Sequence, residues 1–126
     1  MKRGILLFAH GARDPRWAEP FEAVAAKVRA SDATLVVQPA YLEFMSPALR
    51  EAGDILAAAG CGRVDVVPLF LGAGGHVRKD LPALLDALRG AHPQVEWRLQ
   101  RAIGEVESVI DAMASAASAL ASDPTA

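Results

Sequence analysis

Cysteine is almost lacking in this sequence, where Cys61 is the single example among 126 residues. One cysteine cannot form an intramolecular disulfide or a multi-cysteine zinc or iron–sulfur site, and this low usage points to a reducing compartment.

No apolar stretch approaches the ~18–20 residues of a membrane span. The apolar residues 5–9 end at His10, too early for the core of a signal peptide. We therefore expect a cytoplasmic protein with no membrane partner.

An excess of basic charge is lacking too. Thirteen Lys and Arg against fifteen Asp and Glu leave a net charge of −2, so no global field attracts nucleic acid or an anionic membrane. An anionic ligand would need a local group of cations. With 52% apolar and 22% charged residues the chain can build a core. Its length suits one domain, which we place at residues 1–121, followed by a frayed tail at 122–126.

Four short apolar runs alternate with apolar residues at helical spacing. The runs cover residues 4–9, 34–40, 64–71 and 95–99. The helical pattern after the fourth run comprises Val106, Val109, Ile110, Met113, Ala117 and Leu120. Strands that are nearly continuous in apolar residues are buried on both faces, and their alternation with helices gives a covered parallel sheet. We predict one α/β domain of flavodoxin-like βα repeats, with a four-stranded parallel sheet and helices on both faces.

Three loops are expected to carry the functional site, because ligands of open α/β sheets bind beyond the carboxyl ends of the strands. The loops begin at residues 10, 41 and 72. Two of the three histidines, His10 and His76, follow buried strands, and Glu43 lies in the loop between them in sequence. A lone histidine in such a loop is most often structural, and Glu43 alone is ambiguous. Two histidines and a carboxylate at one edge favour a site.

Histidine and carboxylate together form a mixed donor set for Co²⁺, Ni²⁺, Fe²⁺ or Zn²⁺. Three protein ligands leave positions open, as in catalytic metal sites. The sequence has no HExxH, GxSxG, GxxxxGK[ST] or strand-linked GxGxxG pattern. Metal handling and histidine-based phosphoryl transfer remain as the possible chemical functions. Cys61 is expected to be inert, and His92, on the other edge of the sheet, to have no functional role.

Three segments carry a specific resemblance. The stretches LLFAHGARDPR (6–16), YLEFMSPAL (41–49) and VVPLFLGAGGHVRKDLP (66–82) resemble the class II chelatases of the CbiX/SirB type. That family inserts Co²⁺ or Fe²⁺ into sirohydrochlorin on the way to cobalamin or sirohaem. The resemblance covers residues 4 to about 110, and the length is similar to that of the short single-domain form, which is a homodimer.

The resemblance implies roles for individual residues. His10 and His76 would bind the metal and act in catalysis, and Glu43 would bind metal or accept protons. Ala12 is a departure, since many relatives have Ser there. The divalent metal (Co²⁺, Fe²⁺ or Ni²⁺) would be a substrate, with no tightly bound cofactor.

The tetrapyrrole substrate carries several carboxylates, and candidate binding groups lie beside the loops. Gly74 and Gly75 would let the backbone approach it closely. The candidate cations are Arg13, Arg16, Arg78 and Lys79, although Arg78 and Lys79 also suit a solvated helix surface. Exposed apolar residues are expected near the site, with Leu42, Phe44, Met45 and Phe70 as candidates.

Two other classes remain as alternatives. A metal or tetrapyrrole carrier would use the same residues without turnover. A histidine phosphatase has Arg-His-Gly after its first strand, whereas Ala9 precedes His10 here.

Overall fold

The structure is a computed structural model that describes residues 1–72 and 74–125, apart from the side chains of residues 75–78. Its elements, in chain order, are β1 (Lys2–Ala9), the 3-10 helix η1 (Pro15–Ala18), α1 (Glu19–Ser31), β2 (Leu35–Tyr41), α2 (Leu49–Ala58), β3 (Cys61–Pro68), α3 (Gly75–Ala91), β4 (Glu96–Leu99), the 3-10 helix η2 (Ile103–Glu105) and α4 (Glu107–Ser122). Among the described residues no helix is long and apolar enough to cross a lipid bilayer.

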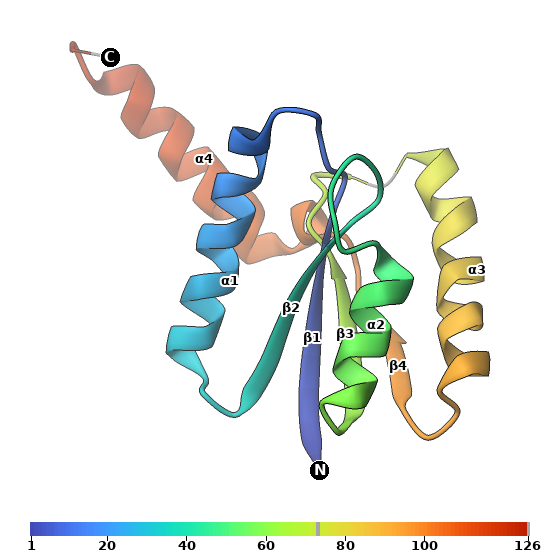
Figure 1. Ribbon diagram of the computed structural model, residues 1–126. Coiled ribbons are helices and arrows are strands. Elements are labelled where there is room, and N and C mark those ends of the chain that lie inside the picture. Colours follow the sequence, from blue (N-terminus) through green and yellow to red (C-terminus); the bar gives the residue numbers. More distant parts are fainter. Residues whose placement is uncertain (73, 126) are drawn as a thin grey trace.

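The strands form one four-stranded sheet in the order β2-β1-β3-β4, and all neighbouring pairs are parallel (Figure 1). β1 is hydrogen-bonded on both sides, to β2 and to β3. The residue that follows β1 therefore leaves the sheet between the two neighbouring strand ends. The predicted fold class, a four-stranded parallel sheet with helices, is confirmed.

Two helices, α2 and α3, cover one face of the sheet. Alternate strand residues point to opposite faces, and Leu6 and Phe8 of β1 join Val64 and Val66 of β3 in the larger core cluster. On the other face α1 lies over the β2 side. There Leu7 and Val37 contact Ala25 of α1 in a smaller cluster. The face opposite α2 and α3 is thus only partly covered by α1.

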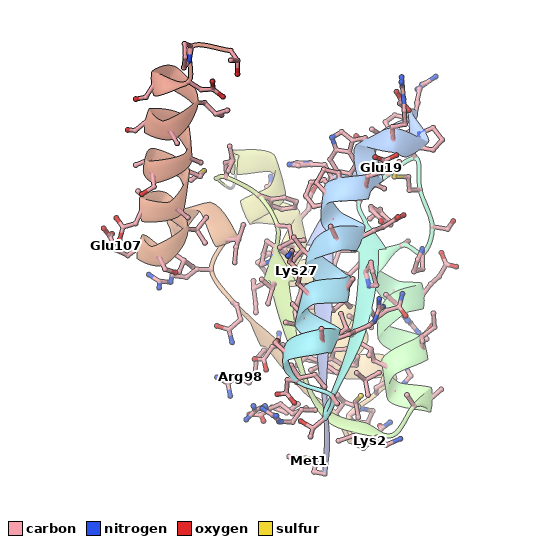
Figure 2. The ribbon with its side chains drawn as sticks, turned by 90° about the vertical axis from the view of Figure 1, so that its left-hand side faces the viewer. Met1, Lys2, Glu19, Lys27, Arg98 and Glu107 are labelled. Carbon is pink, nitrogen blue, oxygen red and sulfur yellow. The ribbon has the colours of Figure 1, made fainter. Side chains whose placement is uncertain are left out.

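The fourth helix departs from the sequence prediction. No residue of α4 is buried, and the helix projects away from the sheet in both Figure 1 and Figure 2. The physical reason lies in η2. The Gly104 amide donates to the Phe70 carbonyl at 2.9 Å, and a Cβ on Gly104 would lie 2.0 Å from the Leu71 carbonyl oxygen. This close approach fixes where α4 starts. The helix predicted after the fourth apolar run is therefore present, but none of its apolar residues is buried.

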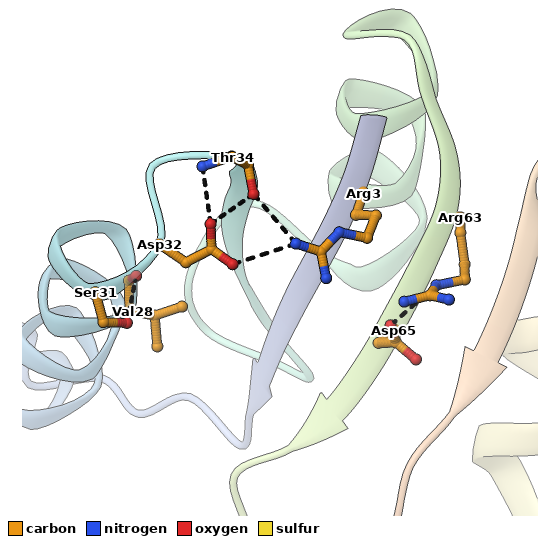
Figure 3. Close-up of polar contacts among 7 residues, drawn as sticks. All are labelled: Arg3, Val28, Ser31, Asp32, Thr34, Arg63 and Asp65. Atoms are coloured by element: carbon orange, nitrogen blue, oxygen red, sulfur yellow. Dashed lines mark hydrogen bonds and ion pairs between the residues drawn. The ribbon is translucent and has the colours of Figure 1, made fainter. Parts of the chain in front are cut away.

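Ion pairs lie on the sheet face that α1 partly covers, toward the amino ends of the strands (Figure 3). Arg3 donates to Asp32 at 3.2 Å and to the Thr34 hydroxyl at 3.1 Å. The Thr34 hydrogen bonds, more than the charge of Arg3, lower the pKa of Asp32. On β3, Arg63 lies 3.7 Å from Asp65. The charged part of this face is thus well separated along the strands from the loops at their carboxyl ends.

Candidate functional site

The loops after β1, β2 and β3 lie at one end of the molecule, the upper end in Figure 1, where α3 also begins. This is the carboxyl edge of a parallel sheet, where ligands of such folds bind. The edge therefore has the location that the sequence predicts for the site.

His10 follows the last residue of β1 and is exposed to solvent. Its ring lies against Phe70, with ring centroids 4.2 Å apart and planes inclined at 32°. Phe70 itself is 3% exposed, so the exposed imidazole rests on a buried aromatic ring. The contact restricts the orientation of the imidazole while leaving it accessible to a ligand.

Glu43 is held beside His10 by the backbone. The Leu42 amide donates to the Ala9 carbonyl at 2.9 Å, and the Glu43 amide donates to the His10 carbonyl at 3.0 Å. These bonds extend the pairing of β1 and β2 past the point where the strands end. The Glu43 side chain is exposed, so an imidazole and a carboxylate are presented from adjacent strand extensions.

Gly11 makes this pairing possible. Its φ is +88°, and a Cβ at this position would lie 1.9 Å from the Glu43 carbonyl oxygen. Only glycine adopts such a conformation without a steric cost and tolerates such a close neighbour. The residue pair His10-Gly11 is therefore one structural unit, in which the glycine allows the Glu43 backbone to come close to the chain after His10.

Arg13 and Phe44 form a second exposed feature at the edge. The Arg13 guanidinium lies 4.8 Å from the centroid of the Phe44 ring, a cation–π distance. Phe44 is 57% exposed and has a φ of 65°, which is uncommon for a residue with a side chain. This pair presents an aromatic surface and a positive charge in the loops that follow β1 and β2.

The other predicted cations differ in their surroundings. Arg16 is engaged with Asp14, 2.9 Å away, and that hydrogen bond lowers the pKa of Asp14. Lys79 is exposed on α3, and Gly74 caps the amino end of that helix. His76, Gly75 and Arg78 fall in the first turn of α3, and their side chains lie outside the described part of the structure.

Only two of the three metal ligands predicted from the sequence have side chains in the described part of the structure. His10 and Glu43 are brought together, whereas His76, the other predicted ligand, lies outside the described side chains. Among the side chains that are described, no three from His, Cys, Asp and Glu lie close enough to hold a metal ion. The roles of His10, His76 and Glu43 stay predictions.

Two hollows lined by described residues border Tyr41 near this edge. A hollow of about 210 Å³ is lined by Tyr41, Met45 and Glu22, among others, and one of about 170 Å³ is lined by Tyr41, Leu42 and Phe8, among others. Pockets for drug-sized ligands measure ~300–1,000 Å³. Both hollows are smaller than this range. Burial raises the pKa of the Tyr41 hydroxyl.

The apolar residues expected near the site are distributed unevenly. Phe44 is exposed as expected, whereas Leu42 and Met45 are half-buried. The expectation that Phe70 is exposed is wrong, because its ring fills the core beneath His10. Sequence reasoning therefore missed the role of Phe70 as a support, because an aromatic residue just after a strand suits either a core or a rim position.

Two residues expected to lack function occupy structural positions. His92 Nε2 lies 2.6 Å from Asp54 Oδ1, an interaction that is the main cause of the lowered Asp54 pKa. It joins the end of α3 to α2. Cys61 is buried, and burial raises the pKa of its thiol.

Fold and site together define a parallel α/β domain that presents a histidine and a carboxylate on an open edge, as suits a protein that handles metal or large flat ligands. The family model described as CbiX matches residues 4–120. The chain belongs to the CbiX family.

Individual relatives agree with this assignment. A CbiX protein of cobalamin biosynthesis from Marinobacter aquaeolei has a crystal structure that is similar, with a TM-score of 0.80, 35% identity and coverage of 92% of this chain and 94% of that one. The sirohydrochlorin cobaltochelatase of Methanosarcina acetivorans is 33% identical over 68% of this chain and 65% of its own. The enzyme of that name from Priestia megaterium is 29% identical over 86% of this chain but 35% of its own. The match thus spans less than two thirds of these two curated relatives.

Proposed function

We propose that the protein inserts a divalent metal, Co²⁺ foremost and Fe²⁺ or Ni²⁺ as alternatives, into sirohydrochlorin in the formation of cobalamin or sirohaem. The observation that carries the proposal is the placement of His10 beside Glu43 on an open sheet edge, with the two backbones joined by a 3.0 Å hydrogen bond. Membership of the CbiX family and the cobaltochelatase names of relatives support the choice of reaction.

The chemistry of insertion explains why this pair of groups is suitable. The macrocycle must lose two pyrrole protons and receive a metal that sheds its other ligands. A neutral imidazole binds a divalent metal or accepts a proton through a ring nitrogen, and a carboxylate also accepts protons. His10, His76 and Glu43 would present the metal from one side without enclosing it, so that transfer to the macrocycle stays favourable.

Substrate binding is assigned to the cations and glycines at the edge. Arg13 is the best supported, because its guanidinium lies over the exposed Phe44 ring and, within the described residues, no carboxylate pairs with it. An aromatic ring beside a cation suits a flat macrocycle with peripheral carboxylates. Lys79 and Arg78 on α3, with Gly74 and Gly75 before them, would contribute from the other side of the edge.

The proposed working form is a homodimer in the cytoplasm. A single open edge provides one wall for a large rigid disc, whereas ligand sites usually bury most of their ligand's surface. The small hollows around Tyr41 cannot supply the second wall. Two-fold pairing is the commonest way for a soluble chain to do so.

The test is catalytic turnover. Purified protein at a small fraction of the sirohydrochlorin concentration is mixed with Co²⁺, and the visible absorption change is followed against the spontaneous rate. An enzyme converts many equivalents of macrocycle per chain. A carrier gives at most one equivalent of bound metal or macrocycle and no acceleration beyond it, which would overturn the proposal.

A further inference from the structure

Phe44 presents an aromatic ring to solvent in the loop after β2, at the upper end of the molecule in Figure 1. It is 57% exposed even with the Arg13 guanidinium 4.8 Å from the ring centroid. Its apolar neighbours in the loop pack inward instead. Leu42 packs against the larger core cluster, and Met45 packs against the cluster around Tyr41. The loop therefore reaches the core through other residues and leaves the Phe44 ring available to a ligand.

The backbone at Phe44 is strained. Its φ is 65°, and across it the Met45 amide donates to the Glu43 carbonyl at 2.8 Å. A hydrogen bond between residues two apart, with a positive φ in the middle, forms the rare and strained type of γ-turn. For a bulky residue such a φ is an outlier. Strain of this kind persists only where the surroundings impose it, and it is concentrated at active sites and ligand clamps. The exposed ring is thus held at a cost that core packing does not explain.

The strained turn is joined to the groups of the candidate site. The Glu43 amide donates to the His10 carbonyl at 3.0 Å, and the Glu43 carbonyl, which closes the turn, is the atom that Gly11 approaches. The backbone that holds the imidazole and the carboxylate therefore also sets the position of Phe44. Each loop supplies one group suited to metal chemistry and one suited to a flat anionic ring: His10 and Arg13 after β1, Glu43 and Phe44 after β2.

We propose that the macrocycle stacks on the Phe44 ring, and that Phe44 selects a flat substrate and aligns it with His10 and Glu43. This rests on the proposed function and specifies how its substrate is bound. Aromatic rings pair in offset-stacked or edge-to-face arrangements. Stacking on an exposed aromatic side chain binds flat heterocycles without reading the groups at their rim, as nucleic-acid bases show. Arg13 beside the ring supplies the complementary contact, a charge-assisted hydrogen bond to a carboxylate at the rim.

The first test is a titration with metal-free sirohydrochlorin, followed by its absorption spectrum, which measures macrocycle binding without insertion. Phe44→Gly should raise the Kd at least about tenfold because the stacking surface is lost. Its urea midpoint should not fall, because glycine adopts a positive φ without steric cost. Phe44→Leu keeps apolar bulk and should raise the Kd about fivefold, whereas Phe44→Trp should bind at least as tightly as the wild type. Ile55→Ala is the matched control, since Ile55 of α2 is 48% exposed, and should leave the Kd unchanged.

A second test observes the Phe44 ring directly. The chain has four phenylalanines, so protein labelled at its phenylalanine rings gives a small set of NMR signals, and Phe44→Leu identifies the signal of Phe44. When metal-free sirohydrochlorin is added, the ring current of the macrocycle should shift the Phe44 signal upfield by more than the other three. A Phe44 signal that stays in place while the macrocycle binds overturns the proposal.

The outcomes separate this proposal from the proposed reaction. Unchanged affinity in Phe44→Gly and Phe44→Leu, in a protein that inserts Co²⁺, overturns the stacking alone. Weakened binding in these variants of a protein without turnover counts against the reaction and leaves the stacking in place. A wild type that neither binds nor metallates the macrocycle overturns both. If Phe44→Leu lowers the native mass measured by light scattering, the ring belongs to a contact between copies of the chain, and the stacking is overturned.

Discussion

The Glu43 amide donates a hydrogen bond to the His10 carbonyl at 3.0 Å, so the two side chains of most chemical interest at this edge are joined through their backbones. A link of this kind does not depend on the rotamer of either side chain. It holds an imidazole and a carboxylate on adjacent strand extensions before any ligand arrives, which is the preorganisation that a metal-transferring site requires.

Gly11→Ala tests that arrangement. The new Cβ would collide with the Glu43 carbonyl in a positive-φ conformation, so we expect a loss of about 1–3 kcal/mol of folding free energy and a large fall in insertion rate. Gly90→Ala is the matched control. It lies inside α3 with open space around its Cβ position and should stabilise the fold by ~0.5–1 kcal/mol. Chemical denaturation measures both, and an unchanged Gly11→Ala protein would contradict the account.

Glu43→Gln tests the carboxylate. The amide is nearly isosteric and leaves the backbone bond to His10 in place, so stability should be unchanged while turnover falls by ~10²–10⁴, the range of general acid–base contributions. Steady-state kinetics with Co²⁺ and sirohydrochlorin measures the effect. If Glu43→Gln leaves turnover unchanged and only Glu43→Ala lowers it, the side chain has a structural role instead.

Arg13→Ala tests charge recognition of the substrate. An exposed ion pair contributes up to ~1 kcal/mol, so KM should rise by up to about fivefold with little change in kcat. Arg13→Lys keeps the charge and should recover part of the loss. Lys27→Ala removes one positive charge from the exposed surface of α1 and should leave KM unchanged. An equal effect of both alanine variants would indicate general electrostatics rather than a site.

Asp54→Asn tests the link between α2 and α3. Because the hydrogen bond from His92 lowers the pKa of Asp54, its carboxylate stabilises the fold above the ordinary carboxyl pKa near 4, and the contribution is lost as the pH falls through the lowered value. The variant should thus be less stable than wild type at pH 5 by less than ~1 kcal/mol, since Asp54 is 47% exposed. The difference in stability between the variant and the wild type should vanish in stronger acid. Urea unfolding as a function of pH measures it.

Much of the fold could be predicted because burial on both faces leaves an unambiguous pattern in the sequence. The apolar runs at β1, β2 and β4 match the strands within two residues, whereas the run at β3 is displaced by three residues toward the carboxyl end. The rule about carboxyl ends then selects the loops that hold His10 and Glu43. The support of His10 by Phe70 could not be predicted, since a phenylalanine after a strand suits either a core or a rim. The role of Gly11 depends on a backbone contact with a residue 32 positions away in sequence.

The direction of α4 was also beyond sequence reasoning. Its apolar stripe indicates that the helix covers something, but periodicity carries no information on which surface it covers. That choice depends on η2, where Gly104 lies against the Leu71 backbone.

The most direct measurement is the initial rate of Co²⁺ insertion into sirohydrochlorin by the wild type, His10→Ala and His76→Ala at equal concentrations of folded protein. His10 is exposed at a strand end, and the His76 backbone lies in the first turn of α3. Circular dichroism should confirm that both variants remain folded. The account predicts a wild-type rate well above the spontaneous one and variant rates close to it. Wild-type rates in either folded variant, or no acceleration by the wild type, would contradict it.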